Sequence, residues 1–258
     1  MEALDASRLA SEGLEARVLA RCGSTNTELL ASREPFVQAV LLATEEQTAG
    51  RGRRGRRWHA APHAAITFSL ARRIARAVRE LPALSLVAGV ALATALRALG
   101  AREVALKWPN DLVARDAKLG GILVETRLSG GMPLAVVGVG LNYSRDEALG
   151  RRLGRAVVSL EELIADLPGR NAVIRTCAAE LLRALERFER DGLDAARSAW
   201  PALDANAGRR LRVRLADGRT VTGLAAGLAE DGALRLETRA GTRVIRSGRV
   251  AQVRARAA

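Results

Sequence analysis

Residues 48–58 read TAGRGRRGRRW, and this segment indicates a loop from which the strands on either side can be assigned. From Gly50 to Trp58 it holds five arginines, three glycines and one tryptophan, with no acidic residue. Glycine allows a backbone to curve closely around a ligand, and arginine offers planar donors suited to carboxylate and phosphate. We therefore predict an anion-binding loop that is mobile when empty, because its like charges repel one another.

This loop lies between two apolar runs, residues 37–43 and 64–70, that are typical of buried strands. It therefore connects two core strands. A helix is expected from Thr25, whose hydroxyl can cap a first turn that has Glu28 three residues later. Apolar spacing predicts further helices over residues 84–99 and 174–188, and further strands over residues 103–108, 112–114, 121–127 and 134–139.

The pattern changes after Trp200, where short alternating strands are separated by the turn signals Asp217-Gly218 and Asp231-Gly232. These strands are expected over residues 211–215, 220–224 and 233–237. They predict a small antiparallel β barrel. The whole chain is thus predicted to be α+β, with a mixed sheet and flanking helices over residues 1–206 and the barrel over residues 207–258.

The composition of the 258 residues narrows the class of protein. With 48% hydrophobic residues the chain can bury a large core. It has no uninterrupted run of 18 apolar residues and no apolar signal region at its N-terminus, so we expect a cytoplasmic protein without a membrane span. Cys22 and Cys177 fit no metal or redox spacing, and Cys177 is expected in the core.

The net charge of +13 comes almost entirely from arginine. The basic residues are scattered along the chain, which indicates solvated faces and a composition bias more than one nucleic-acid surface. Against that background the chain has kept lysine only at Lys107 and Lys118. Lysine is a compact point charge on a flexible stem, which arginine does not reproduce, so these positions are predicted to carry chemistry.

Familiar nucleotide and metal motifs are missing from the sequence. It contains no Walker-type glycine-rich loop, and residues 138–143, GVGLNY, lack the third glycine of the dinucleotide fingerprint. His59 and His63 are four residues apart, but Pro62 lies between them and no carboxylate is near. A plain loop is expected there, and no metal site from the protein alone.

Four segments together resemble a known family. They are Ser24-Thr25-Asn26; Gln47 with the loop from Gly50 to Trp58; KWPND at residues 107–111 with KLGGILVE at residues 118–125; and GVGLN at residues 138–142. In this order and spacing they resemble the biotin–protein ligases, also called biotin–[acetyl-CoA-carboxylase] ligases. The resemblance is close over about residues 18–145 and looser beyond them.

The resemblance implies a two-step reaction on a catalytic domain at residues 1–206, followed by an SH3-like β barrel at residues 207–258. Biotin and ATP, the latter with Mg²⁺, form biotinyl-5′-AMP, and the biotinyl group then passes to one lysine of a biotin carboxyl carrier protein. The first step brings a carboxylate against a phosphate, and these two anions need cationic screening. The residues assigned to catalysis are Lys118, Arg53, Lys107 and Asp111. Asp111 is expected to pair with a loop arginine or to steer the acceptor lysine.

The resemblance also assigns ligand-binding residues. The ureido ring of biotin needs uncharged donors and acceptors, which Ser24, Thr25, Asn26 and Gln47 offer, while Trp58 and the Gly120-Gly121 backbone offer an apolar wall. The full biotin set also includes Arg51, Gly52, Arg53 and Lys118. The residues assigned to ATP or the adenylate are Arg51, Arg53, Arg54, Lys107, Asn110, Lys118 and Asn142.

Several alternatives stay open at this stage. Ser24 and Thr25 serve equally well as a plain helix cap, and Asn110 as a turn residue after Pro109. Lipoate or octanoate ligation is the nearest rival activity. A non-catalytic nucleic-acid-binding protein is the rival from another class, although the chain has few aromatic residues for base stacking. Only 23 residues precede Ser24, so sequence-specific DNA binding is not expected, and the resemblance allows a homodimer.

Overall fold

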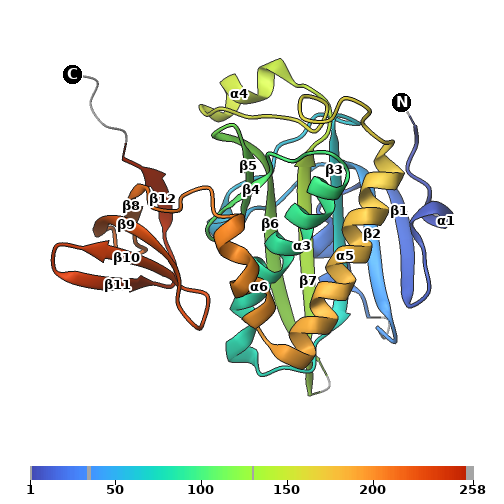
Figure 1. Cartoon of the computed structure of the whole chain (residues 1–258). Coiled ribbons are helices and arrows are strands. Elements are labelled where there is room, and N and C mark those ends of the chain that lie inside the picture. The colour runs from blue at the N-terminus through green and yellow to red at the C-terminus, as the bar shows by residue number, and fades with distance from the viewer. Residues whose placement is uncertain (1, 34–35, 130, 254–258) are drawn as a thin grey trace.

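The computed structural model describes residues 2–33, 36–129 and 131–253, and a seven-stranded mixed sheet forms the centre of its larger part (Figure 1). The strand order is β1-β2-β3-β7-β6-β5-β4, with β1 parallel to β2 and all other neighbours antiparallel. The strands are β1 Leu14–Cys22, β2 Ala39–Gln47, β3 Ala65–Arg73, β4 Ala105–Lys107, β5 Asp111–Ala114, β6 Ala117–Ser129 and β7 Met132–Asn142.

Helices cover both faces of this sheet, but unequally. Two long helices, α3 (Leu84–Ala98) and α5 (Arg170–Asp191), pack against each other over one face (Figure 1). The short helix α2 (Thr25–Ala31) contacts β2, β3 and β7 on the other face. The remaining helical segments are α1 Ala6–Leu9, η1 Arg53–Gly55, η2 Val78–Ala83, α4 Glu147–Leu153, α6 Asp194–Ala199 and η3 Trp200–Ala202.

Alternation along the strands explains this two-sided packing. In β2, Leu41 and Ala43 join the large apolar core under α3 and α5, whereas Val40 and Leu42 join a smaller cluster with Leu29 of α2. The smaller cluster covers only part of its face. The rest of that face is left for polar side chains, and the site described below lies there.

One helical run in the described part of the chain, Val78–Ala98, is long and apolar enough by composition to cross a membrane. Its apolar window is 67% buried within the protein. Most of this run is α3, which packs on α5 in the core, and burial of this kind is usual for a core helix.

A second sheet follows the larger part of the chain and contains five antiparallel strands in the order β11-β10-β9-β8-β12 (Figure 1). No ladder joins its edge strands β11 and β12 within the described residues, so the expected barrel is observed as an open sheet. The strands are β8 Arg210–Arg214, β9 Thr220–Leu228, β10 Leu234–Thr238, β11 Gly241–Ile245 and β12 Arg249–Gln252.

The predicted α+β class is confirmed, and each strand and long helix named above is present, with ends shifted by a few residues. The edge strand β1 was missed because arginine and glutamate alternate with its apolar residues. Both cysteines are free, and Cys177 is fully buried, which raises the pKa of its thiol to about 12. Its predicted place in the core is therefore confirmed.

Candidate functional site

Three neighbouring strands form the floor of the site, on the α2 face of the sheet. The register places Gly138 of β7 between Ser69 of β3 and Leu123 of β6, and places Gly140 beside Gly121. A side chain at Gly138 would collide with Asn26, because a Cβ there would lie 2.3 Å from Oδ1 of Asn26. The glycines therefore make the room into which α2 and the arginine loop insert their side chains.

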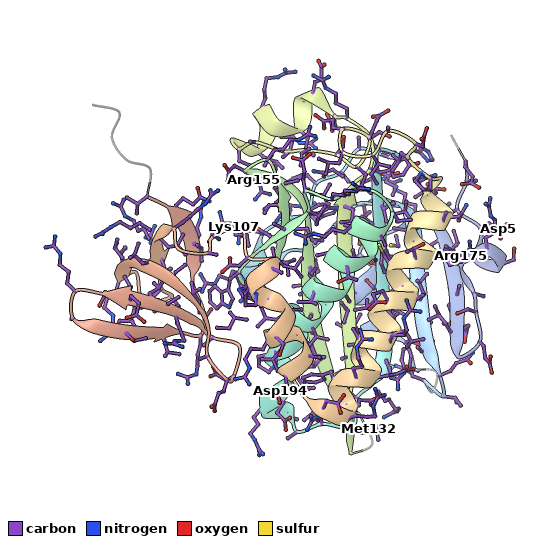
Figure 2. The ribbon with its side chains drawn as sticks, in the orientation of Figure 1. Asp5, Lys107, Met132, Arg155, Arg175 and Asp194 are labelled. Carbon is purple, nitrogen blue, oxygen red and sulfur yellow. The ribbon has the colours of Figure 1, made fainter. Side chains whose placement is uncertain are left out.

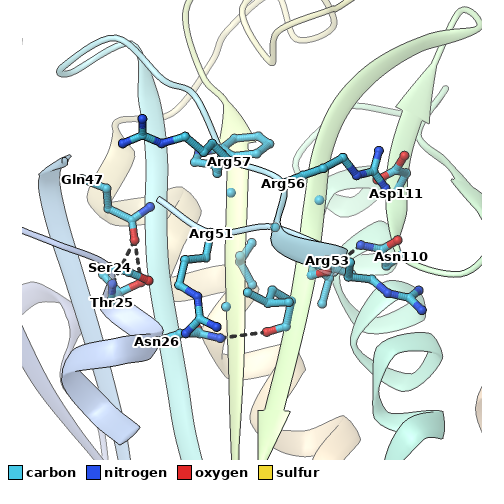
Figure 3. Close-up of a pocket in the computed structure, with 18 of the residues that line it drawn as sticks. Ser24, Thr25, Asn26, Gln47, Arg51, Arg53, Arg56, Arg57, Asn110 and Asp111 are labelled. Atoms are coloured by element: carbon cyan, nitrogen blue, oxygen red, sulfur yellow. Dashed lines mark hydrogen bonds between the residues drawn. The ribbon is translucent and has the colours of Figure 1, made fainter. Parts of the chain in front are cut away.

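The loop between β2 and β3 closes over this floor and completes a pocket of about 670 Å³, part of it open to solvent (Figure 3). Ser24, Thr25 and Gln47 lie at one end, and Asn110 and Asp111 lie at the other (Figure 3). The pocket is lined by Ser24, Thr25, Asn26, Gln47, Arg51, Gly52, Arg53, Arg56, Arg57, Trp58, Asn110, Asp111, Lys118, Gly121, Ile122, Leu123, Gly138, Val139, Gly140 and Arg155.

Backbone hydrogen bonds hold the base of the loop. The Trp58 amide donates to the Gly50 carbonyl at 2.9 Å, and the Gly52 amide donates to the Arg56 carbonyl at 2.7 Å. The indole of Trp58 lies against Gly140, where a Cβ would lie 2.5 Å from its ring. The Trp58 indole nitrogen is buried and has no hydrogen-bond partner in the structure. An unpaired buried donor at a pocket wall favours a ligand that brings an acceptor.

The end of the pocket near α2 presents uncharged hydrogen-bonding groups, with Arg51 beside Asn26 as the charged side chain that approaches it (Figure 3). The Thr25 amide donates to Oε1 of Gln47 at 2.9 Å, which leaves the Gln47 amino group as a donor on the pocket side. Ser69, which no pattern in the sequence singled out, lies within 2.6 Å of both Thr25 Oγ1 and Asn26 Oδ1. Helix α2 begins at Thr25 as predicted, but the side chain of Ser24 makes no capping hydrogen bond. The predicted cap by the Thr25 hydroxyl is wrong, because this hydroxyl contacts Gln47 and Ser69 instead.

The opposite end carries a surplus of positive charge. Arg53 and Arg56 extend to this end, near Asp111, whereas Arg51 and Arg57 extend toward Asn26 and Gln47 (Figure 3). Asp111 is the one carboxylate in the described lining of the pocket. The Lys118 ammonium donates to Oδ1 of Asp111. Burial lowers the pKa of Lys118, while the charge and hydrogen bond of Asp111 oppose that shift. Burial, together with Arg54 and Arg56, also lowers the pKa of Arg53. The arginines of the loop therefore repel one another until an anion enters.

The structure gathers most of the predicted site residues around this pocket and leaves four outside its lining. Arg54 donates to Ser247 at 2.7 Å, on the turn between β11 and β12. Gly120 packs against the carbonyl of its neighbour on β7, and Asn142 is buried with its amide donating to the carbonyls of Lys118 and Val158. The roles assigned to these residues remain predictions.

The fourth residue outside the lining is Lys107, at the β4 edge of the sheet (Figure 2). It is the cross-strand partner of Asp111, so both side chains are on one face of the β hairpin. The expected pairing of Asp111 with a loop arginine is not what the structure shows, because its hydrogen-bonded partner is Lys118. Asn110 donates to the Ile122 carbonyl at 2.7 Å, which fixes this turn beside the pocket.

Sequence reasoning missed several residues of the site. Arg155 follows α4 and reaches the pocket from a distant part of the chain (Figure 2). Its only signal in the sequence would have been one arginine among many. Arg56 and Arg57 were visible in the loop but received no role. Within the described residues no group of three His, Cys, Asp or Glu side chains could hold a metal ion.

The arrangement suits a bent, amphipathic ligand with a neutral polar head and an anionic tail. The head would meet hydroxyl and amide groups, and the tail would meet lysine and arginine. Glycines and Trp58 line the space between these ends. Such a pocket could bring a carboxylate and a phosphate into contact while its cations reduce their mutual repulsion.

Comparison with known proteins agrees with this chemistry. Residues 18–142 match the family described as "Biotin/lipoate A/B protein ligase family", and residues 207–251 match "Biotin protein ligase C terminal domain". The chain is 37% identical over 231 residues to the bifunctional ligase/repressor BirA of Escherichia coli, covering 88% of this chain and 70% of that protein.

Two further matches cover most of this chain and most of the related protein. The chain is 37% identical over 250 residues to the biotin–[acetyl-CoA-carboxylase] ligase of Mycobacterium tuberculosis, covering 92% of this chain and 88% of that one. The solved biotin protein ligase of Aquifex aeolicus in complex with biotin and ATP superimposes with a TM-score of 0.79 at 26% identity. That match covers 93% of this chain and 99% of the other.

Proposed function

The chain belongs to the biotin/lipoate A/B protein ligase family, and from this premise we propose that it is the ligase that biotinylates a carrier protein. Biotin is activated with ATP to biotinyl-5′-AMP and is then transferred to one lysine of a biotin carboxyl carrier protein. The observation that carries this proposal is the pocket itself, in which an uncharged hydrogen-bonding end and a cationic end face each other across glycines.

The neutral end fits the ureido ring of biotin. That ring presents one carbonyl acceptor and two N–H donors, and it carries no charge. The amino group of Gln47 is a donor on the pocket side, and the hydroxyls of Ser24 and Thr25 can both donate and accept. Octanoate has no such ring and lipoate has a dithiolane in its place, so neither would use these groups.

The cationic end fits the joining of a carboxylate to the α-phosphate of ATP. In the first step a biotin carboxylate oxygen bonds to the α-phosphorus, and pyrophosphate leaves. Lys118 and Arg53 are positioned at this end of the pocket to stabilise the charge that develops on the phosphoryl oxygens. In the second step the acceptor amine bonds to the acyl carbon, AMP leaves, and the amine gives up a proton. Lys118 would serve both steps.

ATP enters as a substrate together with Mg²⁺. The donor set fits an ion carried mainly by the phosphates, because Asp111 is the one carboxylate in the described lining and is already paired with Lys118. Mg²⁺ usually keeps several waters and binds substrate phosphates through few protein ligands. When bound, it would neutralise phosphate charge and favour the departure of pyrophosphate.

We further propose where the enzyme works and with which partners. A reduced cytoplasm suits two free cysteines, one of them fully buried. The carrier domain of a carboxylase is the proposed acceptor, on the strength of the names of the related ligases. The family allows a homodimer. Residues 1–206 would form the catalytic domain, and residues 207–258 would form the small C-terminal domain.

The decisive experiment measures pyrophosphate release from MgATP with biotin, lipoate or octanoate supplied in parallel. Biotin should support release at micromolar concentration, and the other two acids should not. Mass spectrometry of a purified carrier domain should then show one added biotinyl group. If biotin gives no release above background, the proposal is wrong; release with lipoate or octanoate alone would support the rival ligase activity.

A further inference from the structure

Glu125 of β6 lies beside the pocket without lining it, and its two carboxylate oxygens bind different elements. Oε1 pairs with the guanidinium of Arg51, in the arginine loop, at 2.9 Å. Oε2 accepts a hydrogen bond from Nδ2 of Asn26, at the start of α2, at 3.0 Å. The Glu125 side chain is 21% exposed and that of Arg51 is 50% exposed. One carboxylate thus joins the loop to the helix that lines the neutral end of the pocket.

The hydrogen bonds of Asn26 fix the orientation of its amide. Its Nδ2 faces two acceptors, the carboxylate of Glu125 and, at 3.1 Å, the carbonyl of Leu123. Its Oδ1 therefore faces Ser69, whose hydroxyl must donate because an amide oxygen can only accept. A flipped amide would place Oδ1 against the Leu123 carbonyl and the Glu125 carboxylate, so the hydrogen bonds favour this one orientation.

The same argument extends this series of hydrogen bonds to Thr25. Ser69 lies 2.6 Å from both Asn26 Oδ1 and Thr25 Oγ1 but has one proton, which Asn26 requires. The Thr25 hydroxyl therefore donates to Ser69 at 2.6 Å in preference to Oε1 of Gln47, which lies 3.3 Å away. Oε1 of Gln47 is then held mainly by the Thr25 amide, at 2.9 Å. Every hydrogen bond from Thr25 through Ser69 and Asn26 to Glu125 therefore points the same way. The negative charge of Glu125 is the final acceptor of this chain.

We propose that Glu125 is a positioning residue that links closure of the arginine loop, through Arg51, to the arrangement of the biotin-head groups, through Asn26, Ser69 and Thr25. When the loop is closed, Arg51 orients and neutralises the carboxylate. The carboxylate in turn holds Asn26, and Asn26 orders the hydroxyls behind it. This inference rests on the proposed function, since it concerns the same pocket.

The ionised state of Glu125 is essential to this role. A carboxylate can accept from both neighbours, whereas an amide at this position has only one acceptor oxygen and must turn its N–H groups toward Arg51 or Asn26. Both of those groups are donors. The Glu125→Gln change therefore removes one contact whichever way the new amide points. A hydrogen bond to a charged group of this kind corresponds to roughly tenfold to a hundredfold in affinity.

The test compares Glu125→Gln with Arg51→Met, which removes only the loop side of the link. We expect Glu125→Gln to weaken biotin binding about tenfold or more by calorimetry. Hydrogen exchange should be faster at residues 50–57 and also at the Thr25 amide, which reports on its bond to Gln47. Arg51→Met should speed exchange most in the loop and, through the freed Glu125 carboxylate, to a smaller extent at the Thr25 amide. Without ligand, where direct contacts of Arg51 with biotin play no part, the double variant should lose little exchange protection beyond Glu125→Gln, because both changes break the same link.

The matched control is Glu103→Gln, which removes a carboxylate paired with Arg115 on an exposed surface outside the pocket. It should leave biotin affinity and exchange in both segments unchanged. Glu125→Asp keeps the charge and should recover part of the affinity, which distinguishes positioning from a folding defect. Additive losses in the double variant, or an unchanged Thr25 amide in Glu125→Gln, would overturn the link. A wild-type protein that fails to bind biotin would instead contradict the proposed function.

Discussion

The ammonium of Lys118, on β6, donates to Oδ1 of Asp111, on the neighbouring strand β5. Both side chains line the cationic end of the pocket. Gly121 is the cross-strand partner of Asp111, and a Cβ there would lie 3.1 Å from the Lys118 nitrogen. The pair is therefore held in a narrow space. Burial favours the neutral lysine, and Asp111 favours the charged one.

The first prediction concerns the pH dependence of biotin activation. The role proposed for Lys118 needs its cationic form, so the rate should fall as pH rises through its lowered pKa. Asp111→Asn removes the charge that raises this pKa. The alkaline limb of kcat/KM for biotin-dependent pyrophosphate release should then move to lower pH. Lys118→Arg should move that limb upward and lower the rate.

Asp116→Asn serves as the matched control for that profile. Asp116 also pairs with a basic residue, Arg209, but it is exposed and lies outside the pocket. Its variant should keep the wild-type profile. If Asp111→Asn leaves the alkaline limb in place, the pair does not set the ionisation that matters for activation.

A second prediction follows from the close contact between Gly140 and Trp58. Gly140→Ala adds a methyl group where a Cβ would lie 2.5 Å from the indole, so the ring and the end of the loop must move. Biotin affinity should fall about tenfold, in keeping with the usual penalty for overpacking. Gly23→Ala adds the same methyl group where nothing lies within 4 Å and should bind normally. Calorimetry with biotin measures both, and equal affinities would rule out the proposed wall.

A third prediction separates two adjacent arginines. Arg53 lines the pocket, whereas Arg54 is directed to Ser247 of the C-terminal sheet. Arg53→Ala should lower kcat/KM for the first step by about a hundredfold, the scale of one lost electrostatic contact in a transition state. Arg54→Ala should lower it only a few-fold. The reverse order in steady-state assays would show that Arg54 turns into the pocket when substrate binds.

Local patterns in the sequence were sufficient to predict much of the fold. The apolar runs that became β2 and β3 identified the arginine loop as a connection between core strands. The edge strand β1 was not predicted, because its half-exposed arginines interrupt the alternation of apolar and polar residues that is typical of a strand. The short alternating strands also predicted the antiparallel C-terminal sheet, although such a pattern does not determine whether the two edges of the sheet meet.

Site residues that belong to a local sequence motif could be predicted. Site residues that are brought together by the register of separate strands could not. Lys118 stood out because the chain has almost no other lysine. Ser69 and Glu125 did not, because their roles arise from pairing Ser69 with Gly138 and Glu125 with Val136 across separate strands. A one-residue change of register would turn each side chain to the other face. Arg155 gave no signal among so many arginines.

The last prediction concerns the mobility of the loop from Gly50 to Trp58. Its base is held by the hydrogen bond from the Trp58 amide to the Gly50 carbonyl, but Arg54, Arg56 and Arg57 are exposed. Burial first, and then the charges of Arg54 and Arg56, lower the pKa of Arg53. Without ligand, trypsin should cut readily within residues 51–57. Biotin with ATP should suppress these cuts at least tenfold, because bound anions offset the repulsion and order the backbone. Mass spectrometry would assign each site of cleavage, with cuts elsewhere in the chain as the internal control. A loop that resists trypsin equally with and without ligand would show that it is closed from the start and has no gating role.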